Sequence, residues 1–144
     1  MNKIFKLISA SILGLLLTTG VFAKTEVVYI PKNTGNPYFD SIIKGFEVGA
    51  EKYGYNFSTV APATADATSQ LPFIKAEIQR GVDVIAISPN SNDALNTVFD
   101  QARKKGIIIM VVNGDIPGSE AHRDLAIMPV DFSTVGTAQM TLMG

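Results

Sequence analysis

The stretch "EVVYIPKNTGNPYFDSIIKGFEVGAEKYG", residues 26–54, predicts a strand that passes through a short polar loop into a helix. Residues 26–30 are rich in β-branched side chains and end at the polar loop, as a strand does. Asn36 can cap a helix with its side-chain oxygen, and Pro37 suits the first helical position, where its missing N–H needs no partner. Apolar residues then recur at helical spacing as far as Gly54, which suits the left-handed end of a helix.

The same order of strand and helix repeats along the chain. The predicted elements are strands at residues 55–60, 83–88 and 107–112, a helix from near Ser69 to Gly81, and a helix from an Asn92 cap to Gly106. The helix-ending glycines are 27 and 25 residues apart, which is about the length of one βαβ step. This alternation predicts the α/β class, with a three-layer α-β-α, Rossmann-like parallel sheet.

The first 23 residues have the pattern of a secretory signal peptide. Lys3 and Lys6 precede an apolar run, residues 7–17, and the small side chains of Val21 and Ala23 fit a cleavage site after Ala23. The alternative is a membrane anchor, but the run is shorter than the roughly 20 residues that span a bilayer. The sequence has no cysteine to which a lipid could be attached. The prediction is a protein secreted by a cleaved signal peptide and free in a periplasm.

Composition and motifs argue against several other classes of protein. The full chain has a net charge of −1, which becomes −3 without the two lysines of the signal peptide, whereas nucleic-acid binding needs a basic patch. A single histidine, His122, and the lack of cysteine argue against a His-rich zinc site. The glycine-rich phosphate motifs and the G-x-S-x-G nucleophile elbow are absent. The sequence therefore predicts neither an enzyme nor a cofactor.

Polar and aromatic side chains follow the predicted strands at the point where each strand ends. In an open parallel sheet, ligands bind beyond these carboxyl ends. Amides, carboxylates and an ammonium group hydrogen-bond hydroxyls, while an aromatic ring can lie against the C–H face of a sugar. The sequence therefore predicts a site for a small polyhydroxylated molecule. The candidate ligand-binding residues are Lys32, Asn36, Tyr38, Phe39, Ser88, Asn113, Asp115 and Asp131.

Several of these residues have an alternative role that the sequence leaves open. Asn36 caps the helix whether or not it also contacts a ligand. Phe39 begins the apolar face of that helix, so core packing and ligand stacking are both open for it, whereas Tyr38 falls off this face. Lys32 could lie in solvent, and Asp115 could simply form a turn with the glycine before it.

Three stretches, together with the export signal, carry a resemblance to a known family. They are "EVVYIPKNTGNPYFDSIIKGFEVGAEKYGYN", "IKAEIQRGVDVIAISPNSNDAL" and "ARKKGIIIMVVNGD". In this order and spacing they resemble the sugar-binding class of type 1 periplasmic binding proteins, which serve ABC importers and include ribose-, rhamnose- and autoinducer-2-binding members. The resemblance runs from about Glu26 to Asp131 and covers the N-terminal lobe only.

The resemblance implies a two-lobed protein that closes over its ligand at a hinge. The implied division is a signal peptide at residues 1–23, an N-terminal sugar-binding lobe at residues 24–131, and the start of a crossover into a second lobe at residues 132–144. Since the second lobe does not follow, the expected reading is a truncated chain. One lobe alone would offer half of the ligand contacts and no closure.

Near the C-terminus, residues 125–130 are predicted as a last strand, and Ser133 or Thr134 as the cap of a last helix. Asp131 matches an acidic position of the family near the first crossover between lobes. The last helix carries the apolar residues Val135, Ala138 and Leu142. Without a second lobe to pack against, this helix is expected to associate or to fray.

The resemblance also implies roles for individual residues of the site. Asn36, Tyr38 and Phe39 match the family's N-P-[FY]-F segment, whose asparagine and aromatics line the sugar site in ribose-type members. Lys32 matches the lysine of an "IPK" segment that contacts the ligand in autoinducer-2 binders. Asn113 stands where the family usually has a ligand-binding aspartate, and because an amide both donates and accepts, a different pattern of hydroxyls is expected to be recognised.

The function implied is that of the substrate-binding component of an ABC importer, which delivers a sugar-like small molecule from the periplasm to a permease in the inner membrane. A chemoreceptor is left open as a further partner. The alternatives are a truncated, non-functional remnant and a binder of an autoinducer-2-type signal. A flavodoxin-like enzyme is disfavoured because "KNTGNPYF" lacks the Ser/Thr-rich form of a phosphate loop. A sugar-responsive repressor is disfavoured because an export signal takes the place of a DNA-binding helix-turn-helix.

Overall fold

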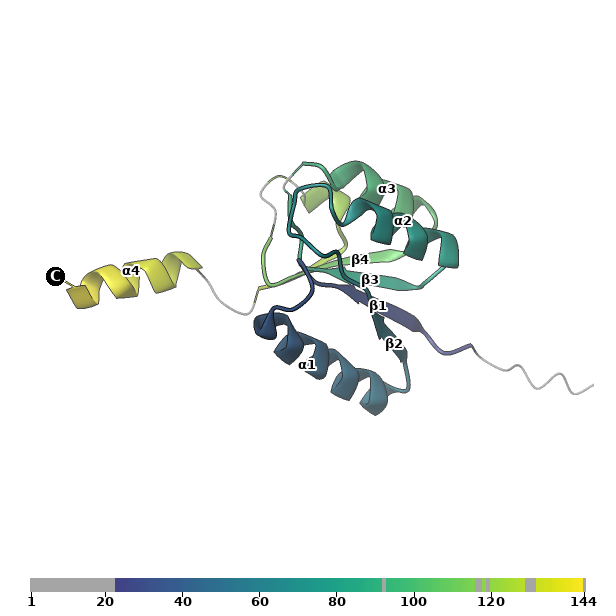
Figure 1. Ribbon diagram of the computed structural model, residues 1–144, viewed down its shortest axis with the longest axis horizontal. Coiled ribbons are helices and arrows are strands. Elements are labelled where there is room, and N and C mark those ends of the chain that lie inside the picture. Colours follow the sequence, from purple (N-terminus) through teal and green to yellow (C-terminus); the bar gives the residue numbers. More distant parts are fainter. Residues whose placement is uncertain (1–22, 92, 116–117, 119, 129–131, 144) are drawn as a thin grey trace, which may run out of the picture.

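The apolar, β-branched segments of the sequence form one parallel sheet, which confirms the predicted fold class. The computed structural model describes residues 23–91, 93–115, 118, 120–128 and 132–143, so the predicted signal peptide up to residue 22, the Asn92 cap and the Asp131 candidate lie outside the described residues. All strand pairs are parallel, in the order β2-β1-β3-β4-β5 (Figure 1). The strands are β1 Glu26–Ile30, β2 Asn56–Thr59, β3 Val84–Ile87, β4 Ile108–Val112 and β5 Leu125–Ile127.

Local sequence signals set the helix boundaries. The helices are α1 Pro37–Tyr53, α2 Leu71–Arg80, α3 Asn96–Lys104, the short 3₁₀ helix η1 Glu120–His122, and α4 Phe132–Met143. The side chain of Asn36 accepts a hydrogen bond from the Tyr38 amide at 3.1 Å, which confirms the predicted cap of α1. Gly54 and Gly81 end α1 and α2 with φ of 73° and 75°, the left-handed conformation that glycine adopts without strain.

The predicted start of α3 was wrong. This helix begins at Asn96, four positions after the expected cap at Asn92. The Ser91 hydroxyl accepts hydrogen bonds from the Asp93 and Ala94 amides at 3.3 and 3.1 Å, so a serine turn precedes the helix. Such a turn offers the backbone an alternative to helical hydrogen bonds, which delays the first helical turn.

The helices divide unequally between the two faces of the sheet. Val28, Ile30 and their neighbours on β3 and β4 face α2 and α3, where Ile74 and Phe99 are fully buried. Tyr29, one residue along the strand, points to the opposite face and joins a smaller core with Phe39 of α1. Three layers result, as predicted, but among the described helices only α1 covers one face, while α2 and α3 share the other (Figure 1).

Candidate functional site

The carboxyl ends of β1, β3 and β4 place three loops on one edge of the sheet. The Tyr38 hydroxyl, at the start of α1, donates a hydrogen bond to Oδ1 of Asn113, which directly follows β4. The Tyr38 side chain is 53% exposed, so the pair lies at the surface of this edge. The structure thus joins two predicted site residues that are 75 positions apart in the sequence.

Asn113 has an unusual backbone conformation. Its φ is 70°, and it is the only residue other than glycine with positive φ among those that the structure describes. Asparagine tolerates this left-handed region better than most residues. The Asn113 amide donates to the Ile127 carbonyl at 2.9 Å, which ties the turn to β5. This backbone conformation is costly for most residues, and such strained conformations cluster at functional sites. Here it occurs at the residue whose side chain meets Tyr38.

Asn36 and Phe39 lie on the other side of the start of α1. They line a cavity of about 260 Å³ between the first loop, α1 and the end of β2. Phe39 is only 4% exposed and meets the Tyr38 ring edge to face, with 5.3 Å between the ring centroids. Of the two roles left open for Phe39, the structure supports core packing beneath Tyr38. A ligand contact by Asn36 or Phe39 stays a prediction.

Lys32 lies on the same edge, in the loop after β1. Its backbone carbonyl accepts a hydrogen bond from Nδ2 of Asn90 at 2.8 Å. The side chain is half-buried, and no carboxylate of the described ranges forms an ion pair with it. The backbone of the Lys32 loop is therefore tied to the loop after β3, and a ligand contact by the Lys32 ammonium group stays a prediction.

Gln70 joins three segments of the edge, and the sequence analysis missed it. The side chain is fully buried. Its Nε2 donates to the carbonyls of Pro31 and Ser88 at 3.0 and 2.9 Å, and its Oε1 accepts from the Asn90 amide at 2.9 Å. One side chain therefore fixes the loops after β1 and β3 against the start of α2. No local pattern distinguishes such a glutamine from a solvent-facing one.

Ser88 lies beneath the edge and does not face outward. It is fully buried, and its hydroxyl contacts the Tyr29 hydroxyl at 2.8 Å and donates to the Val112 carbonyl at 3.1 Å. A ligand contact would require the hydroxyl to leave these partners. The observed bonds instead link the ends of β1, β3 and β4, the strands that carry Lys32 and Asn113.

Asp115 forms a two-pronged ion pair with Arg123, with nitrogen–oxygen distances of 2.8 and 2.6 Å. The hydrogen bond to Asp115 raises the pKa of Arg123. The carboxylate thus anchors the turn after β4 to the segment that leads into β5. A ligand contact by Asp115 stays a prediction, and the Asp131 candidate lies outside the described residues.

The burial of the Tyr29 hydroxyl predicts a loss of stability at high pH. Burial raises the pKa of Tyr29 to about 12. In the unfolded chain a tyrosine ionises near pH 10, so from about pH 10 to 12 the unfolded state releases a proton that the folded state retains. The free energy of unfolding is therefore expected to fall by up to about 2–3 kcal/mol across this window. Urea unfolding at intervals between about pH 9 and 12 measures it.

The Tyr29→Phe variant is the control for this pH effect. It keeps the ring in the core and removes the ionising hydroxyl, so its stability is expected to stay flatter over the same window. An equal fall in Tyr29→Phe and in the wild type would show that other groups cause the loss.

Within the described part of the chain, no group of three or more His, Cys, Asp or Glu side chains could hold a metal ion. None of the helices among the described residues is long and apolar enough to cross a membrane. The loops at this edge carry amides, hydroxyls, an ammonium group and an exposed aromatic ring, which together suit hydrogen bonding to hydroxyls and contact with a sugar ring.

Comparison with known proteins relates this architecture to a family. Residues 27–144 match the family described as "Periplasmic binding protein domain". The D-allose-binding periplasmic protein of Escherichia coli is 32% identical over 111 residues, which make up 76% of this chain and 36% of that protein.

Two solved structures share the fold closely. A solute-binding protein of an ABC transporter from Burkholderia graminis, in complex with D-arabinose, is 31% identical with a TM-score of 0.77 over 83% of this chain and 40% of that chain. Another from Clostridium phytofermentas, with bound L-rhamnose, is 26% identical with a TM-score of 0.77 over 84% of this chain and 37% of that chain. The chain thus spans 36–40% of the length of these three proteins. With a type 1 periplasmic binding protein fold and a family match over most of its residues, the chain belongs to the periplasmic binding protein domain family.

Proposed function

We propose that this lobe binds a small sugar-like molecule at the carboxyl edge of its sheet and acts as the substrate-binding component of an ABC importer. The observation that carries the proposal is the Tyr38–Asn113 pair, which sits at the exposed edge where this fold class binds ligands. The names of the relatives support it, since one binds D-allose and two solved structures hold D-arabinose and L-rhamnose. Export to the periplasm and delivery to an inner-membrane permease belong to the same proposal.

The chemistry of the edge suits a polyhydroxylated ligand. Asn113 uses its carbonyl oxygen for Tyr38, which leaves its Nδ2 group to donate to a ligand hydroxyl. The exposed Tyr38 ring offers an apolar face to sugar C–H groups. Lys32 adds a cationic donor that favours an electron-rich hydroxyl or carbonyl oxygen. We propose that these three side chains make the first contacts with the ligand.

A binder of an autoinducer-2-type signal is the second candidate. The observation that favours it is Lys32, whose ammonium group has no ion-pair partner among the described residues. The two candidates predict different effects of a Lys32→Met substitution. Loss of the positive charge should weaken binding of a carbonyl-bearing signal more than binding of a neutral sugar.

Isothermal titration calorimetry of the purified protein tests the function. The ligands are D-allose, D-ribose, D-arabinose, L-rhamnose and autoinducer-2. Because one lobe provides half of the contacts of a closed site, the expected affinity is weak, with Kd on the order of 1 mM, equivalent to about 4 kcal/mol. Saturable heat from at least one ligand supports the proposal. Absence of binding to all five, in protein shown to be folded by circular dichroism, contradicts it.

A further inference from the structure

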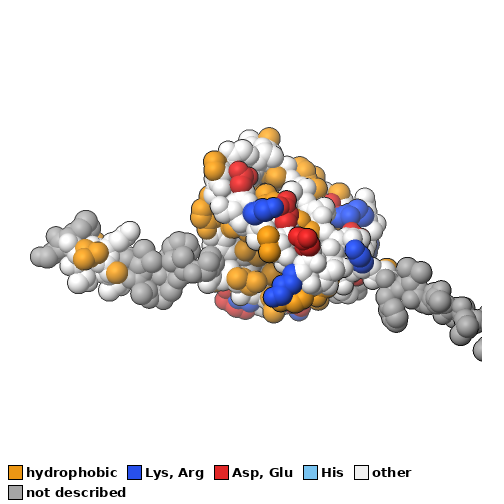
Figure 2. Space-filling model, turned by 90° about the horizontal axis from the view of Figure 1, so that it is seen from below, with side chains coloured by type: hydrophobic (Ala, Val, Ile, Leu, Met, Phe, Trp, Pro, Cys, Tyr) orange, Lys and Arg blue, Asp and Glu red, His pale blue; other side chains and the backbone are white. Residues whose placement is uncertain are grey.

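Two buried hydroxyl groups link three strands beneath the carboxyl edge of the sheet. The Ser88 hydroxyl donates to the Val112 carbonyl at 3.1 Å and contacts the Tyr29 hydroxyl at 2.8 Å. A serine hydroxyl carries one hydrogen, so the Tyr29 hydroxyl is the donor to Ser88. Neither side chain has exposed area, so neither belongs to the molecular surface, of which Figure 2 shows one face with charged and hydrophobic side chains interspersed. The Ser88 hydroxyl therefore acts on the backbone of β4.

The Ser88 hydroxyl takes the place of a backbone donor that the chain lacks. Between the parallel strands β3 and β4, hydrogen bonds recur at every second residue. The Ile108 amide donates to the Asp83 carbonyl at 2.9 Å, and the same pattern, continued along the strands, assigns the nitrogen of residue 89 to the Val112 carbonyl. Pro89 has no N–H to donate. Ser88 thus satisfies a carbonyl that would otherwise end the ladder without a partner.

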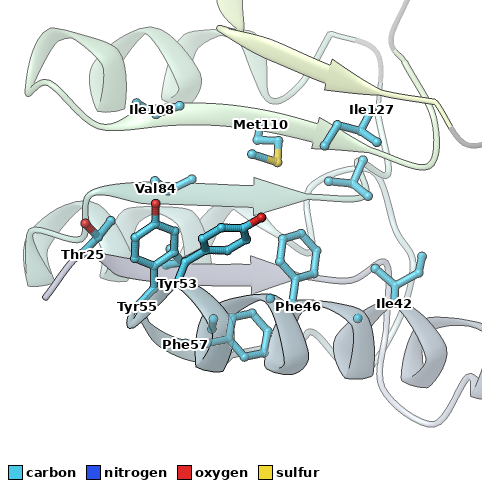
Figure 3. Close-up of a pocket in the computed structure, with 15 residues that line it drawn as sticks. Thr25, Ile42, Phe46, Tyr53, Tyr55, Phe57, Val84, Ile108, Met110 and Ile127 are labelled. Carbon is cyan, nitrogen blue, oxygen red and sulfur yellow. The ribbon is translucent and has the colours of Figure 1, made fainter.

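The Val112 carbonyl belongs to the peptide unit that leads into Asn113. The other end of this unit, the Asn113 N–H, donates to the Ile127 carbonyl at 2.9 Å. The Val112 side chain lines an apolar groove beside α1 together with Met110 and Ile127 (Figure 3). The strand therefore keeps its alternation up to Val112, and the chain turns at Asn113. The peptide unit at this turn is held from β3 on one side and from β5 on the other.

This hold matters because Asn113 has the less common sign of φ. Turns of types I and II differ by the rotation of one peptide unit, which changes φ of the following residue between about −90° and about +80°. Asn113 has φ of 70°, which a residue other than glycine seldom adopts unless its surroundings hold it there. In this conformation its Oδ1 accepts the hydrogen bond from the Tyr38 hydroxyl. A peptide unit that is free to rotate would no longer fix the turn that presents Asn113 to Tyr38.

We propose that Ser88 is a positioning residue that holds Asn113 in the conformation in which it meets Tyr38. It acts through the Val112 carbonyl, as the donor that Pro89 cannot supply. This role rests on the proposed function, because Asn113 acts on a ligand only if the ligand binds at this edge. Ser88 itself stays buried and makes no contact with the ligand, in contrast to the direct contact predicted from the sequence.

Amide hydrogen exchange of the isotope-labelled protein tests this role without a ligand. Ser88→Ala removes the bond to Val112, so exchange of the Asn113 amide is expected to speed up at least about tenfold. Tyr29→Phe is the matched control, because it removes a hydroxyl of the same cluster and leaves the Ser88–Val112 bond in place. Its Asn113 exchange is expected to stay within about threefold of the wild type. Equal exchange at Asn113 in the two variants would overturn the proposal.

The double variant Tyr29→Phe, Ser88→Ala separates positioning from stability. In Ser88→Ala the Tyr29 hydroxyl is left buried without its acceptor, which lowers the free energy of unfolding. The double variant also removes that hydroxyl, so it should be at least as stable as Ser88→Ala, while its Asn113 amide should exchange as fast. Exchange that follows the free energy of unfolding in urea, and not the loss of the Ser88 hydroxyl, would overturn the proposal.

Calorimetry distinguishes this role from the proposed function. With the sugar that binds the wild type best, both variants that lack the Ser88 hydroxyl should bind at least about threefold more weakly, and Tyr29→Phe should bind as the wild type does. Faster exchange at Asn113 with unchanged affinity would overturn the role of Ser88 in binding. A wild type that binds none of the sugars, with faster exchange in the Ser88 variants, would contradict the proposed function and still support the hold of Ser88 on Asn113.

Discussion

Replacing Asn113 with glycine is expected to weaken sugar binding at least about tenfold while leaving the fold nearly as stable as before. The side-chain amide that meets Tyr38 and faces the proposed ligand is lost. The backbone keeps its φ of 70°, which glycine adopts without strain. Calorimetry with the ligand that binds the wild type best measures the affinity, and urea unfolding measures the stability.

Asn113→Ala separates the backbone effect from the side-chain effect. It removes the same amide but places a Cβ atom in the left-handed region, which costs about 1–2 kcal/mol of stability. Binding should be lost to the same extent as in Asn113→Gly, whereas the free energy of unfolding should fall only in the alanine variant. Equal stability of the two variants would contradict the backbone argument.

Substitutions at Tyr38 and at an exposed control residue of the same helix extend the test of the binding site. Tyr38→Ala should weaken binding as strongly as Asn113→Gly, because the substitution removes both the aromatic face and the hydroxyl. Tyr38→Phe should retain part of the affinity, since it loses only the bond to Asn113. Val48→Ala, exposed further along α1, should bind as the wild type does. Full affinity in both Tyr38→Ala and Asn113→Gly would remove this site assignment.

Gln70→Leu is expected to cause the largest loss of stability, about 3–5 kcal/mol. The substitution keeps a buried side chain of similar volume but leaves three backbone groups without partners: the buried carbonyls of Pro31 and Ser88 and the partly buried amide of Asn90. Each unsatisfied buried group costs about 1–3 kcal/mol, and the losses are not fully additive. The midpoint of urea unfolding measures the change.

Gln79→Leu is the matched control for this substitution. Gln79 lies in α2, the helix that starts directly after Gln70, and is exposed, so its loss should change stability by less than about 0.5 kcal/mol. Similar stabilities of the two leucine variants would show that the Gln70 bonds do not hold the edge together. A stable Gln70→Leu protein that has lost sugar binding would instead show that these bonds position the Lys32 loop alone.

Much of the fold follows from local signals in the sequence. The Asn36 cap with Pro37 marks the start of α1, and the glycines at 54 and 81 mark helix ends, because cap geometry depends on residues next to one another. The serine turn before α3 shows the limit of this reasoning. Ser91 and Asn92 are both good caps, and the choice of Ser91 delays the helix to Asn96.

The Tyr38–Asn113 contact was predictable in position and less so in detail. The rule for parallel sheets places both residues on one edge, where the structure joins them, and ligand binding at that edge stays a prediction. The rule does not say which way a side chain at a strand end points, so it could not show that Ser88 turns inward to Tyr29. Gln70 was not predictable, because its partners come from segments that meet only in the folded chain.

The distribution of helices over the two faces was likewise not predictable from the sequence. The strand and helix order predicts helices on both sides of a parallel sheet. It does not say that, among the described helices, only α1 covers one face, or that an apolar groove lined by Val84, Met110 and Ile127 lies open beside it. That outcome depends on the strand order, which places β2 beside β1 at one edge and β5 at the other.

Amide chemical-shift mapping can show whether a hydroxyl-rich ligand contacts the carboxyl edge of the sheet. The isotope-labelled protein is titrated with the sugar that binds best in calorimetry. We expect saturable shifts at Lys32, Tyr38 and Asn113 and none at Val84 or Ile108, which line the apolar groove beside α1. Shifts confined to that groove, with Tyr38 and Asn113 unchanged at saturation, would show that the ligand does not bind at the carboxyl edge.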